Sequence, residues 1–323
     1  MNKKDTPLVS VIMATFNEPD IYISKSIESI LNQTYSHLEL LIADDSTDQQ
    51  TINIIDYYAK TDNRVKIIRK EFRMGFVPAL NYALQEAKGV YIARMDGDDI
   101  SLPCRIETQV NYLIKKPKKV LVASASYIID NKDTIVTRTF PPISSAFMKM
   151  ELLRGSNPVT HPSVMINTNV AGSFSYKEVK AAEDYLLWLS LLSKGGIGII
   201  HKPLVKYRIL VSSLSHKIDN QNFYYFILML LVKKFSLQDE ISDKEICAYN
   251  TIYEVLRNQK FSNHSEEIIN KGNHFDKYYN LLLKIIPERI LVYIFSIMIF
   301  IKHFFVGKWE KQLVNVINKK TKR

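Results

Sequence analysis

Short runs of consecutive apolar residues alternate with stretches of helical periodicity over the first 130 residues of the chain. The apolar runs are typical of buried strands, whereas Ile23, Ile27 and Ile30 repeat at the spacing of one helical face. The predicted strands are 8–14, 38–44, 65–69 and 90–95, and the predicted helices are 21–33, 51–60 and 78–89. Apolar strands joined by amphipathic helices imply a parallel sheet covered on both faces, so the predicted fold is a doubly wound α/β domain.

Beyond residue 130 the alternation becomes less regular. Residues 134–140, 162–167 and two short runs between 197 and 209 are predicted strands, and 185–196 is a predicted helix with a glycine stop. After about residue 218 the pattern changes to helices rich in Tyr, Phe, Leu and Lys. We therefore expect two parts, a domain over 1–217 and a helical C-terminal region over 218–323.

Polar loops follow three of the predicted strands: ATFNE, DDSTD and DGDD. Ligands of doubly wound sheets bind at the carboxyl ends of the strands, so these loops are expected to converge on one crevice. The turn after the first strand contains no glycine, which disfavours a dinucleotide-binding dehydrogenase, and the sequence has no P-loop.

The third loop crowds Asp96, Asp98 and Asp99 into four positions, where their charges repel one another. Mg²⁺ and Mn²⁺ prefer carboxylate oxygens together with substrate phosphates, so the loop is a candidate metal site for a nucleotide. The ligand spacing of an EF-hand is missing. The alternative is a solvated loop, or a helix start in which Asp99 or Ser101 caps a helix beginning near Pro103.

Composition and the N-terminus favour a cytoplasmic protein. Cys104 and Cys247 lie far apart, which offers neither a disulfide framework nor a cysteine zinc site and suits a reducing compartment. The first apolar run is broken by Ser10 and followed by Asn17 and Glu18, so we interpret it as a strand and not as a signal peptide.

The formal net charge of +10 is concentrated at the C-terminus. Seven basic residues stand against one acid between Lys302 and Arg323, directly after the uncharged run 290–301. That run is shorter than the ~20 residues of a membrane span, and with Trp309 in its basic flank it resembles an interfacial helix on an anionic membrane. A core helix with a solvated tail is the alternative, and nucleic-acid binding is disfavoured because no nucleic-acid motif is present.

Four segments, in this order and spacing, resemble family 2 glycosyltransferases with the GT-A fold. They are VSVIMATFNEPDIYISKSIESILNQTY, LELLIADDSTD, GFVPALNYALQEAKGVYIARMDGDDISLPCR and AAEDYLLWLSLLSKG. The resemblance covers roughly residues 7–215 and implies a GT-A-type, mostly parallel sheet with helices on both faces. It also implies that the D-x-D loop holds a divalent cation, Mn²⁺ or Mg²⁺, on the diphosphate of a UDP-sugar.

The resemblance assigns a role to each acidic residue of the third loop. Asp98 is the principal metal ligand, Asp96 lies nearer the ribose, and Asp99 is either a second ligand or a helix cap. Arg73 and Arg94 are further candidates for offsetting phosphate charge, although a lone arginine is more often structural.

The first two loops acquire nucleotide-binding roles in the same way. The residues implied to cradle the nucleotide are Ala14, Thr15, Phe16 and Glu18. The ring of Phe16 offers a stacking surface for uracil, and Asp45 matches the position that accepts a hydrogen bond from the uracil N–H. The alternative for Asp44 and Asp45 is turn chemistry with Ser46.

An inverting sugar transfer needs a base that deprotonates the acceptor hydroxyl as it attacks. The segment AAEDYLLWL places Glu183 and Asp184 at a helix start, and by resemblance Asp184 is the catalytic base. The alternative is that both carboxylates only favour the helix dipole.

Two departures from the family pattern refine this interpretation. Neither tryptophan lies in the Q-x-x-R-W motif of polymerising members, so transfer of a single sugar is expected. Leu210 stands where close relatives have a histidine after Y-R, so His161 or His216 must substitute, or the site is weaker.

The resemblance and the C-terminal pattern together predict an inverting, metal-dependent glycosyltransferase. Its expected donor is a UDP-sugar and its expected acceptor an undecaprenyl-diphosphate-linked sugar, in O-antigen or capsule assembly. We expect peripheral association with the inner face of the bacterial plasma membrane. The alternatives are a catalytically silent nucleotide-sugar-binding or scaffold protein, and an enzyme that uses a GDP- or dTDP-sugar.

Overall fold

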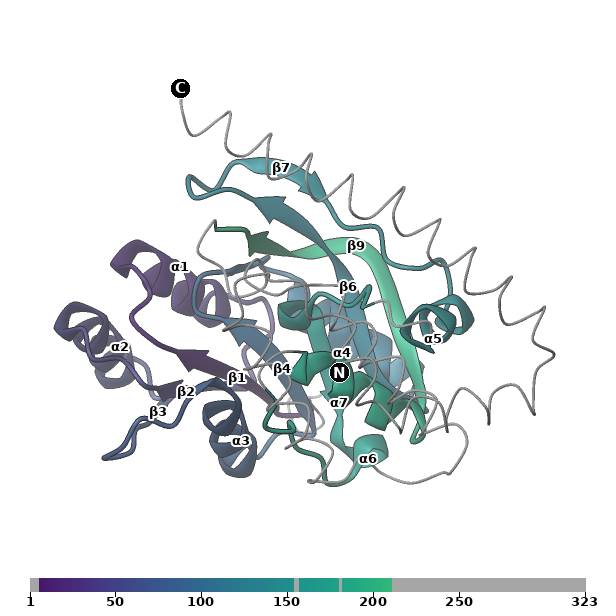
Figure 1. Cartoon of the computed structure of the whole chain (residues 1–323), viewed down its shortest axis with the longest axis horizontal. Coiled ribbons are helices and arrows are strands. Elements are labelled where there is room, and N and C mark those ends of the chain that lie inside the picture. Colours follow the sequence, from purple (N-terminus) through teal and green to yellow (C-terminus); the bar gives the residue numbers. More distant parts are fainter. Residues whose placement is uncertain (1–5, 154–156, 180–181, 211–323) are drawn as a thin grey trace, which may run out of the picture. The chain divides into compact units, whose positions relative to one another are not determined.

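The computed structural model describes residues 6–153, 157–179 and 182–210 (Figure 1). The expected interfacial helix at 290–301 lies outside the described residues, and the division at residue 217 stays a prediction. Within the described ranges, no helix is long and apolar enough to cross a membrane.

The first half of the described chain follows the predicted alternation of strands and helices. Its elements are β1 (Val9–Thr15), α1 (Asp20–Leu31), β2 (Leu38–Asp44), α2 (Gln49–Thr61), β3 (Val65–Ile68), α3 (Phe76–Glu86) and β4 (Tyr91–Asp96). Helix α2 begins two residues before the predicted start because the Asp48 side chain caps it, accepting a hydrogen bond from the Thr51 N–H at 3.0 Å.

Gly89 follows α3, but it is required by strand packing and not by the end of the helix. A Cβ atom at this position would lie 2.5 Å from the backbone nitrogen of Ser10. The Gly89 N–H donates instead to the Ser10 hydroxyl at 2.8 Å. A side chain at position 89 would therefore push β1 away from the start of β4.

The second half differs more from the prediction. Its elements are β5 (Ile100–Ser101), α4 (Arg105–Lys115), β6 (Lys119–Ile129), β7 (Ile135–Arg138), α5 (Ser145–Leu153), the short 3₁₀ helix η1 (His161–Ser163), β8 (Val164–Asn167), α6 (Thr168–Ala171), α7 (Glu183–Leu192) and β9 (Gly196–Arg208). The long strand β6 was not among the predicted strands, although it is buried along almost its whole length.

The prediction of two short strands between 197 and 209 is wrong, because β9 is one strand that pairs in parallel with β6. Pro203 falls at an irregularity of this pairing, opposite Ala125. Proline lacks the N–H that a regular ladder needs and is tolerated at bulges, so it bends the strand without ending it.

The described strands form one mixed sheet in the order β3-β2-β1-β4-β8-β6-β9-β5, with β7 paired to β6. Strands β1 to β4 are mutually parallel, as predicted, whereas β8 runs antiparallel to both β4 and β6. The main apolar core lies between the sheet and helices α1, α2 and α4. Helix α3 covers the opposite face of β1 and β2 (Figure 1).

Candidate functional site

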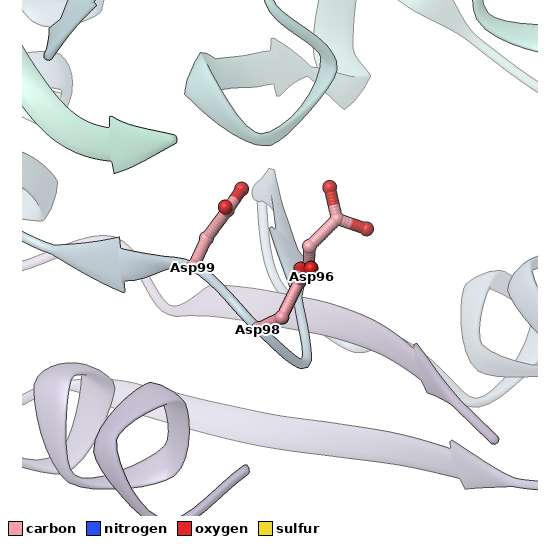
Figure 2. Close-up of side chains that lie close together, drawn as sticks. All are labelled: Asp96, Asp98 and Asp99. Atoms are coloured by element: carbon pink, nitrogen blue, oxygen red, sulfur yellow. The ribbon is translucent and has the colours of Figure 1, made fainter. Parts of the chain in front are cut away.

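Three carboxylates gather where β4 ends and residues 96–99, here called the acidic loop, begin. One ligand oxygen from each of Asp96, Asp98 and Asp99 lies within 4.8 Å of the others. Figure 2 shows the three side chains projecting to the same side of the loop. The crowding predicted from the sequence is therefore present in three dimensions.

Burial increases the free-energy cost of ionising these crowded carboxylates. Burial, together with the charge of Asp96, raises the pKa of Asp98 to about 6 and the pKa of Asp99 well above its usual range. The Asp99 side chain is buried, and its Oδ2 atom has no hydrogen-bond partner among the described residues. Three neighbouring carboxylates, one of which has a buried oxygen without a hydrogen-bond partner, fit a divalent cation that neutralises their charge.

The alternative role of Asp99 or Ser101 as a helix cap is wrong. Helix α4 starts at Arg105, and its N-cap residue, Cys104, makes no capping hydrogen bond through its side chain. Asp99 Oδ1 instead accepts from the backbone N–H of Arg208 at 2.7 Å, and the Ser101 hydroxyl accepts from Gln33 Nε2 at 3.2 Å. Asp99 is thus tied to β9, which the sequence pattern did not reveal.

Two buried arginines contact the acidic loop. Arg94, on the same strand as Asp96, forms an ion pair with its carboxylate. Arg208, at the end of β9, donates from Nε to the Asp98 carbonyl at 2.8 Å, and its Nη1 donates to the Asp130 carbonyl at 2.8 Å. These positive charges partly balance the carboxylates and hold the loop against the rest of the sheet.

The first loop lies directly beside the acidic loop. Ala14 on β1 pairs in register with Asp96 on β4. Glu18 packs so closely against Gly97 that a Cβ atom there would lie 3.0 Å from its carboxyl carbon. Burial, and to a smaller extent the charges of Asp98 and Asp96, raises the pKa of Glu18 to about 7. This carboxyl group therefore belongs to the same electrostatic site.

The remaining residues predicted in the first loop are Thr15 and Phe16. The Thr15 hydroxyl donates to Asp44 Oδ1 at 3.1 Å. The Phe16 ring is 42% exposed, and the guanidinium carbon of Arg73 lies 4.0 Å from its centroid. An exposed aromatic ring with a cation on it offers both a stacking surface and a positive charge.

Asp44 and Asp45 differ in their burial and in their contacts. Asp44 is buried, pairs with Arg69 at 2.8 Å and accepts from the Ser46 N–H at 2.9 Å, so turn chemistry accounts for it. Asp45 is only partly buried and accepts from the N–H groups of Met74 and Gly75 at 2.9 and 2.6 Å. A carboxylate offers about four acceptor sites, so Asp45 retains capacity for a further donor.

A second acidic group, Glu183 and Asp184, begins α7 and is here called the acidic pair. Ala182, which precedes it, has a left-handed backbone conformation with φ of 62°. Asp184 Oδ2 accepts from Asn157 Nδ2 at 2.9 Å, and Oδ1 accepts from the Tyr185 N–H at 2.6 Å.

The acidic pair shares an electrostatic environment with the acidic loop. Burial raises the pKa of Asp184, and burial together with the charge of Asp184 raises the pKa of Glu183 to about 8. The charge of Asp96 raises both pKa values further, whereas Arg94 lowers them. Folding therefore brings the start of α7 within electrostatic reach of the end of β4.

His161 lies beside the acidic pair and outside the group of carboxylates that could hold a metal ion in the described part of the chain. Its Nε2 atom is 2.9 Å from the Tyr176 hydroxyl, and its Nδ1 atom is 3.8 Å from Glu183 Oε1. Burial and the charge of Arg94 hold its pKa well below the usual range. His161 is thus not one of the group formed by Asp96, Asp98 and Asp99, and whether it substitutes for the family histidine stays a prediction. His216 lies outside the described residues.

Comparison with known proteins identifies the family of this chain. A model of the family described as "Glycosyl transferase family 2" matches residues 10–171. The chain belongs to glycosyl transferase family 2. It is therefore a glycosyltransferase, as the motifs predicted, and the confirmed fold is of the GT-A type.

Similar proteins come from archaea and bacteria. An uncharacterized glycosyltransferase of Methanocaldococcus jannaschii is 35% identical over 213 residues, which are 65% of this chain and 73% of that protein. The UDP-Glc:alpha-D-GlcNAc-diphosphoundecaprenol beta-1,3-glucosyltransferase WfgD of Escherichia coli is 34% identical over 214 residues, 65% of this chain and 81% of that protein.

Among solved structures, S. aureus TarS 1-349 in complex with UDP-GlcNAc superposes with a TM-score of 0.57 at 18% identity. The match covers 84% of this chain and 78% of that chain. At this identity the likeness concerns the fold alone.

Proposed function

We propose that this glycosyltransferase is inverting and metal-dependent, and that it moves one sugar from a UDP-sugar to a sugar carried on undecaprenyl diphosphate. The reaction would serve O-antigen or capsule assembly at the inner face of the plasma membrane. The observation that carries the proposal is that the acidic loop and the acidic pair lie within electrostatic reach of each other in one partly buried, charged region. The similarity to WfgD, whose name states such a donor and acceptor, supports the substrate class.

In this proposal the acidic loop is the metal site. Asp98, with Asp99 and Asp96, would hold Mn²⁺ or Mg²⁺, and the cation would supply positive charge to the departing diphosphate. The unpartnered Oδ2 of Asp99 supports a ligand role for that residue alongside Asp98. Asp96 already forms an ion pair with Arg94 within the protein.

The nucleotide would bind over the carboxyl ends of β1 and β2. Asp45 would accept the uracil N–H with the acceptor capacity that Met74 and Gly75 leave free. The residues proposed to line the remainder of this pocket are Ala14, Thr15, Phe16 and Glu18. The cation on the Phe16 ring, Arg73, would add a positive charge next to the nucleotide.

Asp184 is proposed as the catalytic base. Its carboxylate would take the proton of the acceptor hydroxyl while that oxygen attacks the anomeric carbon opposite the leaving diphosphate. This geometry inverts the anomeric configuration in a single displacement.

The proposal is tested by incubating the full chain with a panel of UDP-, GDP- and dTDP-sugars and GlcNAc-diphosphate-lipid acceptors, with products measured by mass. Transfer from one UDP-sugar, dependent on Mn²⁺ or Mg²⁺ and abolished by EDTA, is the expected result. Transfer from a GDP- or dTDP-sugar alone would contradict the proposal that the donor is a UDP-sugar. Nucleotide-sugar binding without transfer to any acceptor would favour the silent binding or scaffold protein.

A further inference from the structure

Asn157 makes a side-chain contact with the proposed base that no feature of the sequence indicates. Its Nδ2 atom lies 2.9 Å from Asp184 Oδ2. Its Oδ1 atom accepts from the backbone N–H of Val159 at 3.3 Å. The two contacts define which end of the amide faces the carboxylate, because an ionised carboxylate accepts hydrogen bonds and cannot donate them.

The amide of Asn157 is one of few groups near Asp184, among the described residues, that favour its ionised form. Charged and titratable groups that interact with Asp184 or with its neighbour Glu183 include Arg94 and Asp96 on β4, His161 in η1, Tyr176, and Tyr207 on β9. Among them Arg94 is a cation, and it is already paired with Asp96. The amide of Asn157 is thus a neutral donor to a partly buried carboxylate that has other carboxyl groups nearby.

We infer that Asn157 is a positioning residue for the base, holding Asp184 Oδ2 so that the carboxylate stays ionised and keeps one orientation toward the acceptor hydroxyl. This inference rests on the proposed function, in which Asp184 is the base. It extends the site to residues 157–160, which directly precede η1.

Loss of the hydrogen bond between Asn157 and Asp184 should have a specific effect on the kinetics of transfer. Burial raises the pKa of Asp184, and the hydrogen bond from Asn157 is the largest effect that lowers it. Loss of the amide would therefore raise the pKa of the base and let its carboxylate rotate. Both changes reduce the fraction of base that is ready to accept a proton, whereas neither changes the nucleotide contacts.

The experiment compares N157A and N157D with the wild-type enzyme in full kinetics over pH. For N157A we expect kcat to fall about 10- to 100-fold, the range for a hydrogen bond to a charged group, with KM for the donor unchanged. The acid limb of the kcat profile should move to higher pH by about one unit. N157D should lose at least as much, because it removes the donor and places a like charge against Asp184.

Controls separate this inference from the proposal on which it rests. Asn157 is exposed, so N157A should keep most of its thermal stability, and UDP binding of both variants should match the wild type. N53A removes an exposed amide on α2 that bonds only to Gln49 within that helix, and it should leave kinetics unchanged.

The outcomes are distinct. Wild-type kcat and pH profile in N157A and N157D, with D184N inactive, would overturn the inference and leave the proposed function standing. A raised acceptor KM with unchanged kcat would also overturn it, because Asn157 would then be an acceptor contact. An active D184N enzyme would instead contradict the proposal that Asp184 is the catalytic base.

Discussion

The acidic loop and the acidic pair are two groups of carboxylates, mostly partly buried, that the fold holds in different ways. Cationic side chains hold the loop: Arg94 pairs with Asp96, and Arg208 binds the Asp98 carbonyl. Neutral groups contact the pair, through the Asn157 amide and the Tyr185 N–H. A carboxylate group that binds a cation needs its charge, whereas a base needs a pKa that still allows it to accept a proton. The difference in partners fits the roles proposed for the two groups, a metal site and a catalytic base.

The largest expected effect separates the two groups by ligand binding. D98N should lose both metal-dependent UDP binding and transfer, because it removes a charge from the proposed metal site. D184N should lose transfer by about 10²- to 10⁴-fold, the usual contribution of a general base, while UDP affinity stays within twofold. Isothermal titration with UDP and Mn²⁺, alongside initial rates, distinguishes the two variants. Equal loss of UDP binding in both would mean that the groups do not have separate functions.

The next effect tests the arginine that ties the acidic loop to the rest of the sheet. Arg208 is buried, donates to Asp98 and Asp130, and stacks 4.0 Å from the centroid of the Tyr22 ring. R208M should destabilise the protein by about 3–5 kcal/mol, because it leaves buried acceptors and the partner carboxylate of Asp133 without the guanidinium.

Urea unfolding measures this change. The matched control is R138M on the exposed edge strand β7, where the expected change is within about 0.5 kcal/mol. R208K should recover only part of the stability, because an ammonium group cannot reproduce the planar fork of donors. Equal stability of R208M and R138M would contradict the structural role of Arg208.

A smaller effect concerns the acidic pair and pH. Burial and Asp184 raise the pKa of Glu183 from 4.5 to about 8. Between these values the native chain retains a proton that the unfolded chain releases, so this group lowers stability as pH rises through that window. E183Q should therefore unfold at the same temperature as the wild type near pH 4.5 and at a higher temperature near pH 8.

Thermal unfolding across this pH range tests the prediction. E86Q, at an exposed glutamate at the end of α3, controls for the general loss of one negative charge. A lower unfolding temperature of E183Q at neutral pH would mean that Glu183 is ionised and stabilising in the native protein.

The smallest effect lies on the nucleotide side, at the exposed contact between Arg73 and Phe16. R73A should weaken UDP binding by about two- to fivefold, as expected for an exposed cation–π contact and one positive charge near the phosphates. K70A removes a comparable exposed contact, Lys70 on the Tyr82 ring, and should leave UDP binding unchanged. Identical affinities of R73A and the wild type would exclude Arg73 from the nucleotide site.

Local pattern predicted the first half of the fold and the acidic loop well. The runs 38–44 and 90–95 become β2 and β4 almost without change. Each strand there is a short, mostly apolar run. Because parallel strands end at one edge of the sheet, the pattern alone predicts that the loops after β1, β2 and β4 lie close together. The second half was less predictable, because β6 and β9 owe their length to pairing with each other.

By itself, the sequence determined the family, the α/β class, and the residue types of both acidic groups, because short-range motifs and periodicity carry this information. Only the tertiary structure decided how those groups are held. Arg208 reaches the acidic loop, and Asn157 reaches Asp184, across long separations in the chain. Hydrogen bonds depend on distances of about 3 Å between atoms, and nothing in local periodicity specifies which distant side chain folding brings that close.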